Sequence, residues 1–136
     1  MDAKLIEQSL ELAAEIGTDL TPRVYRRLFA AHPDMEALFV RDTNGSVRGE
    51  MLARVFEMIL DFIDRRAYGA RMIQCEVVTH EGYGVPLDVF GVFFQTVADT
   101  LREAVGASWT AAMDTAWREM LTEMNWFATH PAQTPG

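Results

Sequence analysis

The chain has 136 residues, of which 49% are hydrophobic, a size and composition typical of one globular domain. Twenty acidic side chains against twelve Lys and Arg give a net charge of −8, which argues against nucleic acid and anionic membranes as partners. The sequence has neither an apolar run of the roughly 18 residues that span a membrane nor the pattern of a signal peptide. We therefore expect a cytoplasmic protein, and the single cysteine, Cys75, agrees with a reducing compartment.

Apolar residues recur every three or four positions along the chain, the spacing that places them on one face of a helix. The longest such runs are Val47 to Phe62, Val85 to Val105 and Trp109 to Met124. We predict an all-α single domain over residues 1–136, in which 129–136 form a flexible tail. The predicted helical segments are, in chain order, 3–17, 21–32, a short turn at 34–39, 46–66, 70–80, 86–105 and 108–128.

Residues at the ends of these segments support the boundaries. Thr21 and Ser108 each offer a hydroxyl N-cap, and Pro22 stands in a first turn, where its missing N–H costs nothing. Gly17 and Gly106 follow predicted helices, and glycine readily adopts the left-handed conformation that ends a helix.

Phosphate-binding Gly-x-x-x-x-Gly-Lys, Cys-x-x-Cys and His-Glu-x-x-His motifs are absent from the sequence. Among the three histidines, His130 lies in the tail, and His32 precedes Pro33 at a helix end, where a cation would suit the carbonyl dipoles. His80 ends an amphipathic segment just before the glycines of the 82–84 loop. From position alone, a buried histidine bonded to a backbone carbonyl is the better interpretation of His80.

Three fragments of the sequence favour a functional interpretation of His80, because they follow one another in the order of a known family on a chain predicted to be all-α. They are VYRRLFAAHPDMEALF at 24–39, His80 with its Gly-x-Gly-Val continuation, and AAMDTAWREM at 111–120. Together they resemble the globin family over nearly the whole chain, most closely single-domain bacterial globins and the haem domain of flavohaemoglobins. Tyr25 and Phe39 stand where the pattern of that family expects them.

The resemblance implies a haem b that reversibly binds a diatomic gas, which would be oxygen, nitric oxide or carbon monoxide. His80 would be the proximal iron ligand, its second ring nitrogen held by a backbone carbonyl or by the hydroxyl of Thr79. Tyr25 would donate a hydrogen bond to bound oxygen, and Phe39 would stack on the porphyrin. The other residues that the resemblance assigns to the pocket are Val47, Met51, Val85, Phe90 and Phe93.

Each of these assignments has a simpler alternative. Phe39 would equally serve as a core residue at a corner, and the Tyr25 hydroxyl would equally bond to backbone. Without haem, the remaining pocket residues would be ordinary core at helical spacing. Val47 cannot donate a hydrogen bond, so Tyr25 would hold the gas alone unless a one-residue shift turns Arg48 inward.

Two further departures from the pattern open other functions. Flavohaemoglobins have a tyrosine where this chain has Phe90, so the proximal relay that activates haem for dioxygen chemistry is missing. Nitric oxide dioxygenase or peroxidase-like activity would in any case need an external reductase. Glu76 stands where the family has an apolar residue against the porphyrin, and an unpaired buried carboxylate is costly. A haemless globin-fold sensor or interaction module is therefore the third possibility.

Overall fold

The structure is a computed structural model that describes residues 2–64 and 87–129 of the chain. Within these two ranges every regular element is helical, which confirms the predicted all-α class. The elements are α1 (Ala3–Glu15), α2 (Thr21–Ala31), the 3-10 helix η1 (Pro33–Phe39), α3 (Ser46–Asp64), α5 (Leu87–Val105), the 3-10 turn η2 (Gly106–Ser108) and α6 (Ala111–Thr129). The predicted helix at 70–80 and the loop that follows it lie outside the described residues.

The predicted stops at Gly17 and Gly106 are confirmed, and Gly45 ends the turn before α3 in the same way. Gly17, Gly45 and Gly106 have φ angles of 72°, 76° and 64°, a left-handed conformation that costs other residues steric strain. Each of them breaks the chain direction at a corner between two helical elements. The predicted tail began one residue too early, because α6 continues to Thr129.

Both hydroxyl caps were assigned to the wrong residue. Thr21 is the first residue of α2, and its N–H donates to the carboxylate of Asp19 at 3.0 Å. Ser108 lies in η2, and the hydroxyl of Thr110 instead accepts the N–H of Met113 at 3.1 Å. Helix α2 starts at Thr21 as predicted, but its N-cap is Leu20, which makes no side-chain cap bond. Thr110 caps α6 two residues after Ser108, so this helix starts at Ala111, three residues later than predicted.

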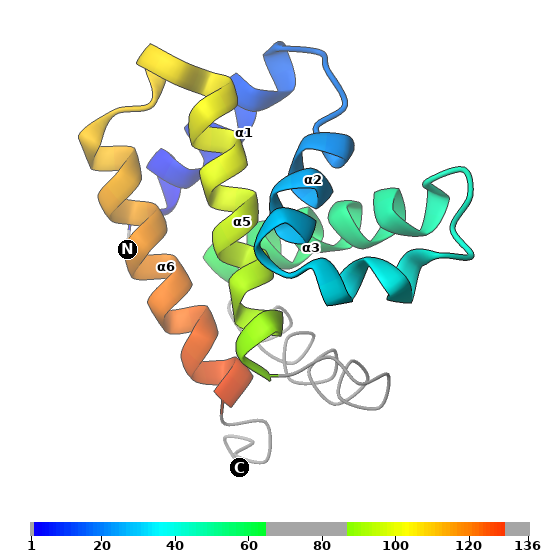
Figure 1. The fold of residues 1–136 in the computed structure, drawn as a ribbon. Helices are drawn as coiled ribbons and strands as arrows, with labels where there is room; N and C mark the ends of the chain where they lie inside the picture. Colours follow the sequence, from blue (N-terminus) through cyan, green and yellow to red (C-terminus); the bar gives the residue numbers. More distant parts are fainter. Residues whose placement is uncertain (1, 65–86, 130–136) are drawn as a thin grey trace.

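Helix α5 lies at the centre of the described fold. It packs against α1, α2 and α6, and α1 also packs against α6 and α3 (Figure 1). Helix α2 contacts η1 and α3 on its other sides. Each described α-helix contributes to the largest fully buried side chains, which are Trp117, Phe62, Ile6, Ile59, Leu101, Met120, Met124, Val24, Val97 and Thr100. No described helix is both long enough and apolar enough to cross a bilayer.

A buried hydrogen bond ties the two ends of the chain together. The indole N–H of Trp117 on α6 donates to the hydroxyl of Ser9 on α1 at 2.8 Å, and both residues are at most 1% exposed. The Ser9 hydroxyl in turn donates to the carbonyl of Ile6 at 2.6 Å. The serine therefore satisfies the one polar atom of the largest buried side chain.

Replacing Ser9 with Ala should destabilise the fold, because it leaves the indole N–H of Trp117 buried without an acceptor. We expect a loss of about 1–3 kcal/mol in the free energy of unfolding, measured by denaturant titration. Ser108→Ala, at an exposed serine, is the control and should change this free energy by less than about 0.5 kcal/mol. Equal effects of the two substitutions would show that the buried bond contributes nothing.

Candidate functional site

A cluster of four aromatic rings lies where α2, η1 and α5 meet. Tyr25 is its centre, because the ring centroids of Phe29, Phe39 and Phe93 lie 5.7, 5.4 and 5.6 Å from its own. The Phe39 ring meets the Tyr25 ring nearly edge-on, at 66°, which is a favourable geometry for an aromatic pair. Tyr25 is only 2% exposed, whereas the three phenylalanines are half-buried. We call these four residues the aromatic cluster.

The amphipathic pattern of α2 turns Tyr25 inward. Val24, Tyr25 and Leu28 are its buried residues, and their spacing of one, three and four places them on one face. Beside this buried face, the partly exposed Arg23 and Arg27 both bind the carboxylate of Glu103 on α5, the Arg23 contact being 2.8 Å.

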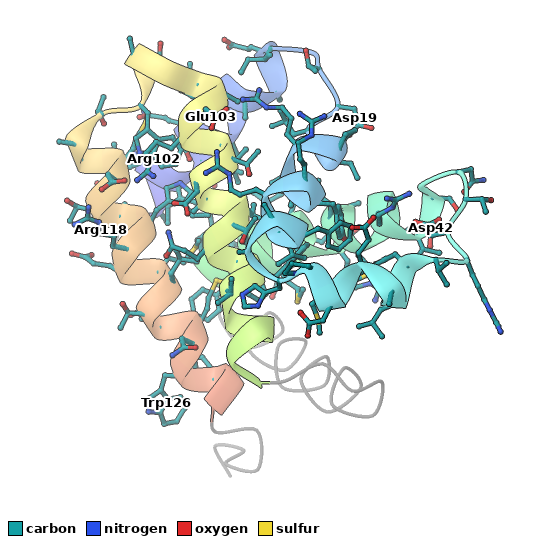
Figure 2. The ribbon with its side chains drawn as sticks, viewed as in Figure 1. Asp19, Asp42, Arg102, Glu103, Arg118 and Trp126 are labelled. Carbon is teal, nitrogen blue, oxygen red and sulfur yellow. The ribbon has the colours of Figure 1, made fainter. Side chains whose placement is uncertain are left out.

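The link to Glu103 holds α2 against α5 from the solvent side (Figure 2). Hydrogen bonding from Arg23 and the charge of Arg27 hold the pKa of Glu103 below its ordinary value. The two arginines sit four residues apart on one helix, so a single carboxylate reaches both. The aromatic cluster thus lies between two helices that contact each other through the rings of the buried Tyr25 and the half-buried Phe93 and through ion pairs exposed to solvent.

The Tyr25 hydroxyl is the polar group at the centre of this apolar cluster. It donates a hydrogen bond to the backbone carbonyl of Arg48 on α3, with 3.2 Å between the two oxygens. Burial raises the pKa of Tyr25 well above its ordinary value, and the negative charge of Asp42 adds to this while the charge of Arg48 opposes it. The phenol therefore stays neutral and remains a hydrogen-bond donor at physiological pH.

Asp42 holds the first turn of α3, to which that carbonyl belongs. Its carboxylate accepts hydrogen bonds from the backbone N–H groups of Val47 and Arg48, at 3.1 and 3.0 Å. It accepts a third from Nε of the Arg48 guanidinium, at 3.1 Å. The guanidinium also donates to the Asp42 carbonyl at 3.0 Å. Desolvation pushes the pKa of Asp42 upward, but these hydrogen bonds and the charge of Arg48 outweigh it, so the pKa lies below its ordinary value.

The sequence analysis did not identify Asp42 as a functional candidate. Its side chain is only 4% exposed, and Figure 2 labels it in the loop that leads into α3. An aspartate shortly before a predicted helix is a capping signal that could have been recognised.

Two open pockets flank the aromatic cluster. One, of about 490 Å³, lies between the start of α2 and the 43–45 loop, and Tyr25, Phe29 and Arg48 are among its walls. The other, of about 400 Å³, is bounded by η1 and again by Phe29 and Arg48, together with Phe39. Small molecules can therefore approach the cluster from solvent on either side of Arg48.

Some of the remaining predicted pocket residues lie in the described part of the chain and the others lie outside it. Met51 is half-buried on α3, as Phe93 is on α5, while Val47 is 49% exposed in the first turn of α3. Arg48 turns its guanidinium to Asp42 and only its carbonyl to Tyr25, which answers the question of whether its charged group points into the cluster. His80, Val85 and the side chain of Phe90 lie outside the described residues, so their roles stay predictions.

The described residues around the aromatic cluster would suit one wall of a pocket for a flat, apolar ligand. They provide aromatic and aliphatic surface that is partly exposed, and one neutral hydroxyl among the rings. In the described part of the chain, no three His, Cys, Asp or Glu side chains gather as a metal site. Such a wall would suit the flat, apolar face of a porphyrin.

The comparison with known families agrees with this arrangement. The globin family model matches residues 22–126, which is more than half of the chain and includes the whole aromatic cluster. The chain therefore belongs to the globin family, whose members generally bind haem. Neither the curated proteins nor the solved structures contain a match to it.

The raised pKa of Tyr25 predicts a specific alkaline behaviour. Because folding favours the neutral phenol, its contribution to stability is complete below the unfolded pKa of about 10 and is lost as the pH rises through the higher folded pKa. The free energy of unfolding of the wild type should therefore fall more steeply above pH 10 than that of Tyr25→Phe, which keeps the ring. Denaturant titrations across this pH range test the difference, and parallel curves would refute it.

Proposed function

We propose that the chain is a haem-binding globin of the bacterial type that reversibly binds a diatomic gas. The observation that carries this proposal is the position of Tyr25, a buried hydroxyl surrounded by three phenylalanine rings in a globin-family chain. A haem b, when bound, would supply a ferrous iron with an open position for oxygen, nitric oxide or carbon monoxide. Phe39, on η1, would face the porphyrin.

Tyr25 acts in this proposal as the distal hydrogen-bond donor. Its phenol stays protonated at physiological pH because burial raises its pKa. A neutral O–H in apolar surroundings stabilises a ligand atom that gains partial negative charge, and the same surroundings keep water away from it. Oxygen gains such charge more than carbon monoxide does, so the hydroxyl favours oxygen.

His80 is the proposed proximal ligand, on the strength of the family pattern around it. A neutral imidazole nitrogen binds haem iron, and a hydrogen bond to the other nitrogen fixes the ring. His32, the only histidine among the described residues, does not compete for this role. Its backbone N–H donates to the carbonyl of Leu28 at the end of α2, and the residue is not among those that line the two pockets beside the aromatic cluster.

A haemless sensor or interaction module is the second candidate, and one observation favours it. The Tyr25 hydroxyl already has an acceptor in the carbonyl of Arg48, and the rings of Phe29, Phe39 and Phe93 contact the tyrosine directly. A structural tyrosine would be satisfied in the same way. Addition of haem to the purified protein separates the two functions.

The purified protein should take up one equivalent of added haemin and develop a Soret band. His80→Ala should abolish or strongly weaken that band, because it removes the proposed iron ligand, whereas the matched control His32→Ala should leave it unchanged. An absorption titration of the three proteins checks this. A wild type that takes up no haemin would support the haemless module, and an unchanged spectrum of His80→Ala would assign the iron to another residue.

A further inference from the structure

We propose that Asp42 is a positioning residue that fixes the Arg48 carbonyl, the acceptor of the hydrogen bond from Tyr25. Asp42 thereby controls how readily the Tyr25 hydroxyl can turn to a bound gas. This inference rests on the proposed function for its effect on the gas. The positioning itself is a property of the chain without haem. Asp42 is connected to the Tyr25 hydroxyl by hydrogen bonds through Arg48, while its charge also raises the pKa of the tyrosine directly.

The first step is the attachment of Asp42 to α3. Two backbone N–H groups and the guanidinium of Arg48 converge on one carboxylate that is 4% exposed. The guanidinium returns a second bond to the Asp42 carbonyl, so the loop and the helix hold each other through both backbone and side chain. Bonds between charged groups are stronger than neutral ones, and this set leaves the first turn of α3 little freedom to move.

The second step is the connection from that turn to Tyr25. Arg48 both binds Asp42 and presents the carbonyl that lies 3.2 Å from the phenol oxygen. A carbonyl in the first turn of a helix moves with the turn, so a change at Asp42 alters the distance or angle of this hydrogen bond. At 3.2 Å the bond is already longer than the usual 2.7–2.8 Å between two oxygens.

The third step is competition between the Arg48 carbonyl and a gas ligand for the single O–H of Tyr25. A phenol has a single O–H, so it cannot donate fully to the Arg48 carbonyl and to a gas ligand at the same time. The ligand gains only the difference between the two hydrogen bonds. A firmly held carbonyl therefore weakens gas binding, and a carbonyl that can move away strengthens it.

Two substitutions separate this positioning effect from simple charge. Asp42→Asn and Asp42→Ala both remove the negative charge, but the asparagine oxygen still accepts a backbone N–H and caps α3. Glu50→Gln removes one negative charge from an exposed position on the same helix and is the control. All three keep the tyrosine and the aromatic rings.

The first measurement uses the protein without haem. The ultraviolet titration of the phenols is recorded for each variant, and the matching curve with Tyr25→Phe added isolates Tyr25 from the other two tyrosines. We expect Tyr25 to ionise at a lower pH in Asp42→Ala than in Asp42→Asn, because only the alanine frees the carbonyl that stabilises the protonated phenol. Equal shifts in the two variants would mean that Asp42 acts through its charge alone, which overturns the proposal.

The second measurement uses the haem-loaded protein and dioxygen. We expect Asp42→Ala to slow oxygen dissociation by about 2- to 10-fold, the range that corresponds to one net hydrogen bond. Asp42→Asn should have a smaller effect and Glu50→Gln none. Rates in Asp42→Ala that equal those of the wild type would overturn the proposal, while failure of the wild type to take up haemin would overturn the proposed function and leave the phenol titration as the test.

Discussion

The rest of the site depends on one constraint, which is that the buried O–H of Tyr25 needs a hydrogen-bond acceptor. Tyr25 lies in an aromatic cluster, so its hydroxyl must find an acceptor on folding, and it finds the carbonyl of Arg48. The same surroundings that require this acceptor also keep the phenol neutral, because burial raises its pKa. A hydroxyl that is protonated, buried and, among the described residues, bonded to one acceptor is well suited to recognise a small ligand, provided that this acceptor can be displaced.

The elements around this hydroxyl are held by contacts of different kinds. Glu103 fixes α2 to α5 through two arginines at the surface, while Ser9 and Trp117 join α1 to α6 in the core. Asp42 fixes the first turn of α3. The exposed ion pairs of Glu103 contribute little to stability, whereas loss of the buried hydrogen bond between Ser9 and Trp117 costs more. Among these contacts, the one that acts on Tyr25 is that of Asp42, which sets the position of the Arg48 carbonyl bonded to the Tyr25 hydroxyl.

The sequence predicted the helices well because their apolar residues recur at helical spacing, as Val24, Tyr25 and Leu28 do on α2. It assigned hydroxyl caps to Thr21, which is the first residue of α2, and to Ser108, two residues before the Thr110 cap of α6, because several neighbouring residues can cap and only the local backbone selects one. The resemblance to globins brought Tyr25, Phe39 and Phe93 to one site, and the structure groups them. It could not reveal that Arg48 turns its carbonyl to Tyr25 and its charge to Asp42, because that depends on tertiary packing.

The infrared spectrum of carbon monoxide bound to the haem-loaded protein tests this account most directly. If Tyr25 shares its proton between the Arg48 carbonyl and a gas on the haem iron, the C–O stretching band of the wild type should lie at lower frequency than that of Tyr25→Phe, because a hydrogen bond to the ligand weakens its C–O bond. Identical bands in the two proteins, or no carbon monoxide bound at all, would contradict the account.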